Sequence, residues 1–133
     1  MINGKIVDTS VWVDFLSKKE FNHVTIFKEI IVENLVIILP VILQEVLQGI
    51  KNDSLFESIK SIMQEYEILE GNQQELALGA ASLYRFLREK GVTVRKPNDC
   101  LIAYSCLYYD VPLLHNDKDF TNIAKHTSLK IYK

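Results

Sequence analysis

The sequence places acidic residues at the edges of its most apolar segments. Each of the following four borders or interrupts a hydrophobic run: Asp8, Glu45, Asp99 and Asp117. Carboxylates held within a few ångströms raise one another's pKa, so such a cluster persists when a divalent cation neutralises it. Oxygen ligands suit Mg²⁺ or Mn²⁺. A cation of this kind supports hydrolysis of phosphodiester bonds by activating water and stabilising charge on the attacking and leaving oxygens.

The elements that must position these acids follow from the hydrophobic pattern. Short apolar runs predict strands at 5–7, 35–39, 67–69, 111–114 and 129–132, and they alternate with segments of helical spacing. One helix is expected over 73–90, with Asn72 as its N-terminal cap and Gly91 as its stop, and another from Pro40 to about Gly49. The alternation predicts a single domain over 1–133 with a three-layer α/β/α sandwich and a central, mainly parallel sheet.

This fold class gives the acids a common location. In open α/β sheets, functional residues gather outside the carboxyl ends of the strands. Asp8 follows the first predicted strand directly, and Asp117 follows the fourth by three residues. Asp99 is expected to open the helix before the fourth strand, and Glu45 to lie inside the helix that follows the second. We therefore expect four distant segments to converge on one edge of the sheet.

Each acid also has a purely structural explanation. An aspartate at a helix start caps free N–H groups and interacts favourably with the helix dipole, which would account for Asp8, Asp99 and Asp117 one at a time. Glu45 could belong to a solvated helix face. The metal hypothesis therefore depends on the four acids coming together.

Composition and charge limit the possible classes of protein. A length of 133 residues suits one domain, and no apolar run approaches the roughly 20 residues of a membrane helix. The N-terminus lacks the pattern of a secretory signal, so a cytoplasmic location is expected. Cys100 and Cys106, the only cysteines, are interpreted as buried thiols.

Positive charge is concentrated in one segment although the net charge is −2. Residues 85–96 contain all three arginines together with two lysines and one glutamate. Such a run is usually a solvated helix end, but beside an acidic site it would suit a polyanionic substrate. The residues expected to contact RNA phosphates are Arg85, Arg88, Arg95 and Lys96.

The order of the acidic residues resembles that of the PIN-domain nucleases, and most closely that of the VapC-type toxins of toxin–antitoxin pairs. The resemblance rests on "IVDTSVWVDFL", "LPVILQEVLQGI", "NDCLIAYSCLYYDVPLLHND" and "DFTNIAK", which occur in the expected order over essentially the whole chain. It implies a PIN-like fold and an acidic core of Asp8, Glu45 and Asp99. The fourth acid is predicted to be Asp117, with Asp119 as the alternative.

The same resemblance implies an activity and partners. The activity is Mg²⁺- or Mn²⁺-dependent endoribonuclease cleavage of RNA, with tRNA or ribosomal RNA as typical targets. A cognate VapB-like antitoxin and a homodimer are the expected partners. Ser10 is expected either to orient Asp8 or to start a helix, and Asn116 either to order the loop around Asp117 or to form a turn. Apolar residues of the early helices could form protein contacts or belong to the core: Phe21, Ile26, Phe27 and Phe56.

Other functions remain to be separated from this one. A haloacid-dehalogenase-like phosphohydrolase needs a second aspartate two residues after Asp8, where this chain has Ser10, and a receiver domain needs a phosphoacceptor that "NLVIILPV" does not offer. A PIN-like binding module without activity would tend to have lost an acid, whereas all four are present. A housekeeping RNA-processing PIN nuclease would keep the same chemistry in another role.

Overall fold

A four-stranded parallel sheet lies at the centre of the computed structural model, which describes residues 2–133. The strands are β1 (Lys5–Val7), β2 (Val36–Ile38), β3 (Glu67–Ile68) and β4 (Leu113–Leu114), in the order β3-β2-β1-β4. All three pairings are parallel. The fifth predicted strand, 129–132, is wrong as a full strand, because only Ile131 forms an isolated bridge, to Leu113.

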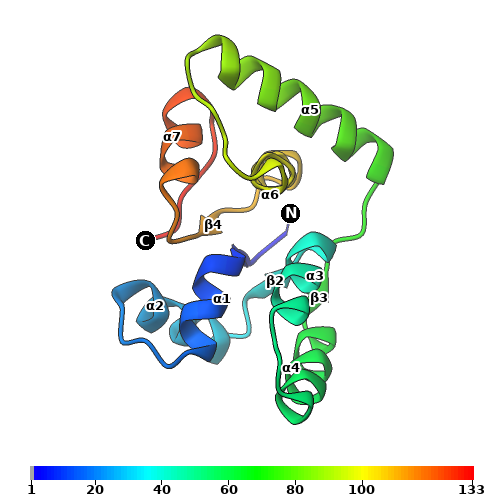
Figure 1. Cartoon of the computed structure of the whole chain (residues 1–133), viewed down its shortest axis with the longest axis vertical. Helices are drawn as coiled ribbons and strands as arrows, with labels where there is room; N and C mark the ends of the chain where they lie inside the picture. The colour runs from blue at the N-terminus through cyan, green and yellow to red at the C-terminus, as the bar shows by residue number, and fades with distance from the viewer. Residues whose placement is uncertain (1) are drawn as a thin grey trace.

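Seven helices flank the sheet in the described part of the chain. They are α1 (Thr9–Leu16), α2 (Asn22–Val32), α3 (Pro40–Gln48), α4 (Asp53–Glu65), α5 (Gln73–Glu89), α6 (Pro97–Tyr109) and α7 (Lys118–His126). In Figure 1, α5, α6 and α7 gather in the upper part and α1 to α4 in the lower part, with the strands between them. The predicted α/β/α architecture is confirmed.

The strands are apolar because helices cover both faces of the sheet. Ile6, Val7 and all three residues of β2 are buried, as the continuous hydrophobic runs of a parallel sheet require. On the α1–α2 side, the rings of Trp12 and Phe27 pack edge to face with centroids 4.7 Å apart. Phe27 is therefore a core residue and not an exposed contact residue.

The helix ends follow local sequence signals. The side chain of Asn72 accepts a hydrogen bond from the Glu75 amide, and Gly91 has a φ of 80°, so the predicted start and stop of α5 are confirmed. The prediction that α6 begins at Asp99 is wrong. Pro97 is its first residue, since the fixed φ of proline suits the first helical turn, and Lys96 occupies the N-cap position.

The strand order creates a switch point between β1 and β4. The chain proceeds outward from β1 to β2 and β3, and then crosses back to place β4 on the other side of β1. Ligand sites in open α/β sheets lie at such a point, beyond the carboxyl ends of the strands. The Asp8 amide donates to the Leu114 carbonyl oxygen (2.9 Å), which aligns the ends of β1 and β4. The loops after these two strands carry Asp8 and Asp117.

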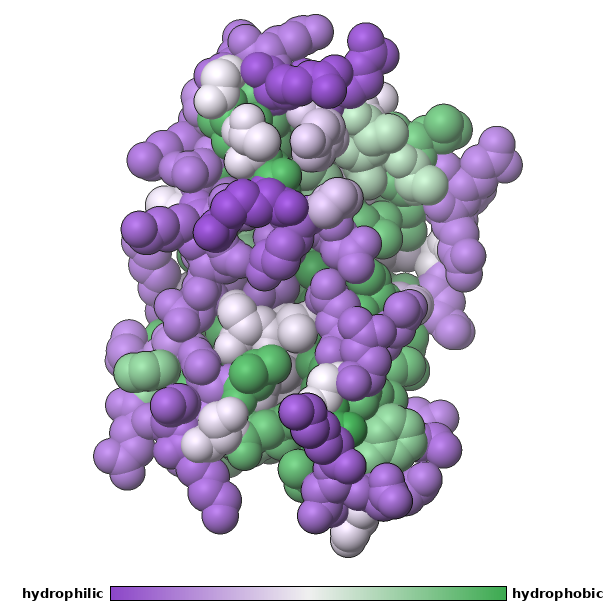
Figure 2. Space-filling view, in the orientation of Figure 1, coloured by the Kyte–Doolittle hydropathy of each residue, from purple (hydrophilic) through white to green (hydrophobic). Residues whose placement is uncertain are grey.

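The surface offers no single dominant apolar face in the view of Figure 2, where apolar residues are interspersed with hydrophilic ones. The exposed large hydrophobic residues are distributed over several helices and include Val13, Phe21, Val32, Leu55, Ile62, Leu78 and Phe86. Within residues 2–133, none of the helices combines the length and hydrophobicity that crossing a membrane requires.

Candidate functional site

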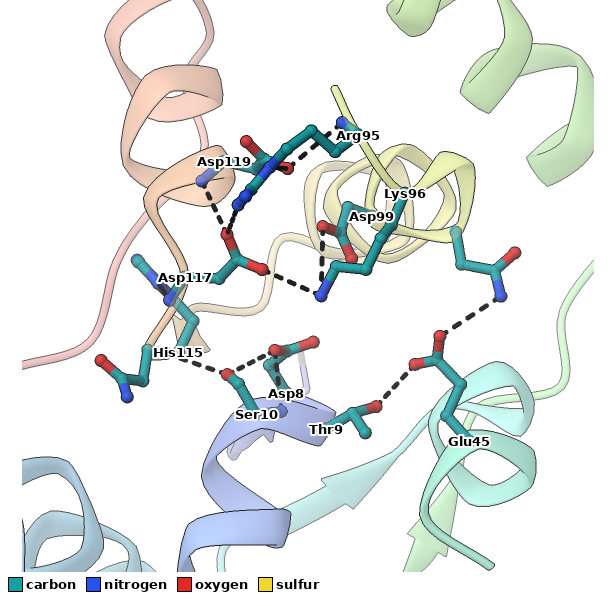
Figure 3. A network of polar contacts seen from close by, with 12 residues as sticks. Asp8, Thr9, Ser10, Glu45, Arg95, Lys96, Asp99, His115, Asp117 and Asp119 are labelled. Carbon is teal, nitrogen blue, oxygen red and sulfur yellow. Dashed lines mark hydrogen bonds and ion pairs between the residues drawn. The ribbon is translucent and has the colours of Figure 1, made fainter. Parts of the chain in front are cut away.

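A cleft of about 390 Å³ opens at the switch point of the sheet. Its lining includes three of the four predicted acids, Asp8, Glu45 and Asp99, which come from the start of α1, from α3 and from α6. The fourth, Asp117, precedes α7 and reaches the same cleft through Lys96. The acids predicted from separate segments therefore converge, as Figure 3 shows.

Three carboxylates among the described residues lie close enough together to share a metal ion. One oxygen from each of Asp99, Asp117 and Asp119 lies within 4.8 Å of the other two. Oδ2 of Asp99 is buried and has no hydrogen-bond partner within residues 2–133. A buried carboxylate that has an unpartnered oxygen and lies beside two other carboxylates is a suitable ligand for an oxygen-preferring divalent cation, so the donor set fits Mg²⁺ or Mn²⁺.

Burial strongly perturbs the acidity of Asp99. Its side chain is only 4% exposed, and this burial raises the pKa of Asp99 to about 7. The positive charge of Lys96 opposes the rise, whereas the negative charges of Asp8, Asp117 and Asp119 add to it. A further positive charge bound beside Asp99 would lower this pKa and favour the ionised carboxylate.

Two cations from the segment before α6 contact this group. Lys96 Nζ lies 2.9 Å from Asp117 Oδ2 and 3.9 Å from Asp99 Oδ2, and the Arg95 guanidinium lies 3.5 Å from both Asp117 Oδ1 and Asp119 Oδ2. Burial would raise the pKa of Asp117, but the Asp119 amide, Lys96 and Arg95 outweigh it and lower that pKa. Arg95 and Lys96, predicted to contact RNA phosphates, therefore contact the acids of the cleft.

Asp8 is held by the start of α1. Ser10 donates to Asp8 Oδ2 from its hydroxyl (2.6 Å) and from its amide (3.0 Å), and its Oγ accepts from the Asn116 amide (3.0 Å). Burial raises the pKa of Asp8, and the two Ser10 hydrogen bonds oppose that rise. Ser10, the second residue of α1, thus contacts Asp8 through two hydrogen bonds, and Asn116 connects this pair to the loop after β4.

Glu45 is fixed by two other segments. Thr9 Oγ1 donates to Glu45 Oε1 (2.6 Å), and Asn98 Nδ2 donates to Oε2 (3.3 Å). Both oxygens of this carboxylate are thereby oriented at the rim of the cleft. Asn98 was not singled out from the sequence, and its place beside Asp99 at the start of α6 is the signal that could have identified it.

The capping explanation is correct for two of the acids and does not compete with the site. Asp8 and Asp117 are the N-caps of α1 and α7, whereas Asp99 is no cap. Asp117 caps with Oδ1 and meets Lys96 with Oδ2. Each capping carboxylate therefore keeps one oxygen for the cleft.

Asp14 is a cleft residue that the sequence interpretation missed. Its Oδ2 lies 2.6 Å from His23 Nε2 and accepts from Asn116 Nδ2 (3.2 Å). The available signal was its position four residues after Ser10 on the same helix, which places both on one face. Arg85 and Arg88, by contrast, are exposed on α5, and their contact with RNA stays a prediction.

Comparison with known proteins agrees with this geometry. A family model described as PIN domain matches residues 5–126. Ribonuclease VapC11 of Mycobacterium tuberculosis is 28% identical over 127 residues, which cover 94% of this chain and 95% of that protein. The fold is similar to VapBC2 from Rickettsia felis bound to a promoter DNA fragment (TM-score 0.75, 20% identity, 96% of each chain). It is also similar to VapBC-1 from nontypeable Haemophilus influenzae (TM-score 0.71, 20% identity, 97% of this chain and 96% of that one). The chain belongs to the PIN domain family.

Proposed function

We propose that this protein is a metal-dependent endoribonuclease that hydrolyses RNA phosphodiester bonds at the cleft beyond β1 and β4. The observation that carries the proposal is the Asp99 carboxylate, which is grouped within 4.8 Å with those of Asp117 and Asp119 and whose buried Oδ2 has no hydrogen-bond partner among residues 2–133. The VapC ribonucleases that align over nearly the whole chain support RNA as the substrate.

The acids have different roles in this proposal. Asp8, Asp99 and Asp117 would hold Mg²⁺ or Mn²⁺, each through an oxygen that no helix cap uses. When bound, the cation would activate water for attack on phosphorus and stabilise the leaving oxygen. Glu45, whose two oxygens accept hydrogen bonds from Thr9 and Asn98, would accept a further hydrogen bond from the attacking water.

Other residues support these acids. Ser10 and Asn116 orient Asp8. Asp119 is assigned an accessory role, because its Oδ2 is already engaged by the Arg95 amide (3.3 Å) and by the Arg95 guanidinium. Arg85 and Arg88 would contact RNA phosphates farther from the cleft.

The biological role follows from the relatives. VapBC complexes are among the similar solved structures, so we infer that this chain is the toxin of a type II toxin–antitoxin pair with a VapB-like antitoxin as its partner. We expect a cytoplasmic protein that forms homodimers and cuts tRNA or ribosomal RNA. A small gene directly upstream that encodes a DNA-binding antitoxin would separate this role from that of a housekeeping nuclease.

The test is cleavage of total cellular RNA with Mg²⁺ or Mn²⁺ by the wild type, Asp99→Asn and Asp110→Asn. Asp110 is a matched control because it is exposed, lies outside the cleft and has a left-handed backbone that asparagine tolerates. We expect discrete fragments from the wild type and Asp110→Asn, abolished by a chelator and absent with Asp99→Asn. Equal cleavage by all three proteins would overturn the assignment. Binding of Mn²⁺ without cleavage of any RNA would favour a binding module.

A further inference from the structure

The Lys96 ammonium lies beside two carboxylate oxygens that face the cleft, Asp99 Oδ2 and Asp117 Oδ2, the inward-facing oxygens. The ammonium lies 2.9 Å from Asp117 Oδ2 and 3.9 Å from Asp99 Oδ2, the oxygen for which the described part of the chain offers no hydrogen-bond partner. In Figure 3 the Lys96 nitrogen points between Asp99 and Asp117, with Asp8 on the opposite side. Of the two cations that contact this group, Lys96 is therefore the one beside the Oδ2 atoms of Asp99 and Asp117.

The helix itself does not account for a lysine at this position. Lys96 is the N-cap of α6 and makes no capping hydrogen bond with its side chain. Lysine lacks the acceptor that an N-cap normally provides, and its charge interacts unfavourably with the positive end of the helix dipole. Residues that disagree with local helix preferences are typical of functional sites. The contacts of Lys96 with the acids of the cleft explain why a lysine stands at this N-cap.

A divalent cation and the Lys96 ammonium would need the same oxygens. Magnesium binds carboxylate oxygens at roughly 2.0–2.1 Å, and a second positive charge beside it would be strongly repelled. The Lys96 side chain is 57% exposed on a flexible stem, so it can withdraw into water while its backbone stays at the start of α6.

Arg95 provides an internal contrast. Its guanidinium contacts Asp117 Oδ1 and Asp119 Oδ2, whereas Lys96 contacts Asp117 Oδ2. Asp117 Oδ1 also caps α7 by accepting from the Asp119 amide. Arg95 therefore stabilises the start of α7 through Asp117 Oδ1 and Asp119 Oδ2. It can stay in place when a metal ion replaces Lys96 at Asp117 Oδ2.

We propose that Lys96 is an internal counter-ion that a divalent cation must displace from Asp99 and Asp117. The inference rests on the proposed metal site. It adds that competition between Lys96 and the divalent cation sets the affinity of the site for metal. When metal is scarce, the Lys96 ammonium offsets the repulsion between the carboxylates of Asp99 and Asp117, and the site fills only when the metal concentration is high enough to displace the ammonium.

The experiment measures the Kd of Mn²⁺ by calorimetry on the full chain for the wild type, Lys96→Met, Lys130→Met and Asp99→Asn. Lys130 is the matched control, because its exposed ammonium also pairs with an aspartate at 2.9 Å, namely Asp110, outside the cleft. We expect a roughly tenfold lower Kd for Lys96→Met, an unchanged Kd for Lys130→Met and greatly weakened binding for Asp99→Asn. Lys96→Gln serves as a second uncharged variant if Lys96→Met aggregates.

Thermal unfolding separates competition from a merely structural role. In chelator, Lys96→Met should unfold at a lower temperature than the wild type, and saturating Mn²⁺ should close that gap. Equal Mn²⁺ affinity of the wild type and both Lys96 variants, or an equal gap with and without Mn²⁺, would overturn the inference and leave the metal site intact. A wild-type protein that binds no Mn²⁺ would overturn the metal site and the inference together.

Discussion

Thr9 and Glu45, separated by 36 positions in the chain, are joined by a 2.6 Å hydrogen bond from Thr9 Oγ1 to Glu45 Oε1. The bond connects the first residue of α1 to the middle of α3, and Asn98 at the start of α6 holds the other oxygen of the same carboxylate. The starts of α1 and α6 therefore hold the Glu45 carboxylate in place at the cleft.

Replacing Thr9 by valine keeps the shape of the side chain and removes the donor to Glu45. We expect kcat/KM for RNA cleavage to fall about tenfold because a misoriented catalytic carboxylate loses its geometry. The free energy of unfolding should fall by only about 1 kcal/mol. Thr9→Ser, which restores the hydroxyl, should recover most activity, and Thr25→Val on the exposed face of α2 is the control. Full activity of Thr9→Val would show that the bond does not position Glu45.

Ser10→Ala should change the pH dependence of cleavage. The Ser10 hydroxyl bond lowers the pKa of Asp8 against the effect of burial, so removing it should raise that pKa. If ionised Asp8 binds the metal, the acid limb of the profile of kcat/KM against pH will move to higher pH. Ser82→Ala on the exposed face of α5 should leave the profile unchanged. An unmoved acid limb in Ser10→Ala would contradict the role assigned to Asp8.

Asp99→Asn should alter how stability depends on pH. In the folded protein the pKa of Asp99 is raised from 3.8 to about 7, so this group's stabilising contribution is complete below about pH 4 and is lost as the pH rises through 7. Asparagine does not titrate. In chelator, the Tm of the wild type should therefore fall relative to that of Asp99→Asn between pH 5 and pH 8. Parallel curves of Tm against pH would show that Asp99 has an ordinary pKa.

The double variant Arg85→Gln, Arg88→Gln tests the basic face of α5. Loss of two phosphate contacts should weaken RNA binding and reduce the slope of log Kd against log salt concentration by about one unit per contact. The Kd of Mn²⁺ should not change, because neither arginine lines the cleft. Lys60→Gln on α4 is the control and should leave the slope at its wild-type value. A wild-type slope in the double variant as well would show that Arg85 and Arg88 do not contact RNA.

The sequence predicts the scaffold and the convergence of the acids better than their individual contacts. Strong local signals predict β1, α3 and α5: an apolar run, Pro40 and the Asn72 cap. The structure confirms the positions of all three elements. The apolar run that Asp99 opens predicts a helix start at Asp99, whereas the fixed φ of Pro97 lets α6 begin two residues earlier.

Contacts between distant segments leave no local pattern in the chain. The pairing of Lys96 with Asp117 depends on how α6 and α7 pack. The concentration of positive charge in "RFLREKGVTVRK" predicts phosphate contacts instead. The bond between Asn98 and Glu45 likewise joins residues 53 positions apart. These contacts could be known only once the fold had brought the segments together.

Anomalous diffraction from crystals soaked with Mn²⁺ tests the central claim most directly, because it locates the metal without relying on activity. We expect a strong peak roughly 2 Å from Asp99 Oδ2, with Asp117 Oδ2 as a further ligand and the Lys96 ammonium turned into solvent. A peak bound elsewhere on the chain, or no peak in the cleft at saturating Mn²⁺, would contradict the proposed metal-dependent nuclease site.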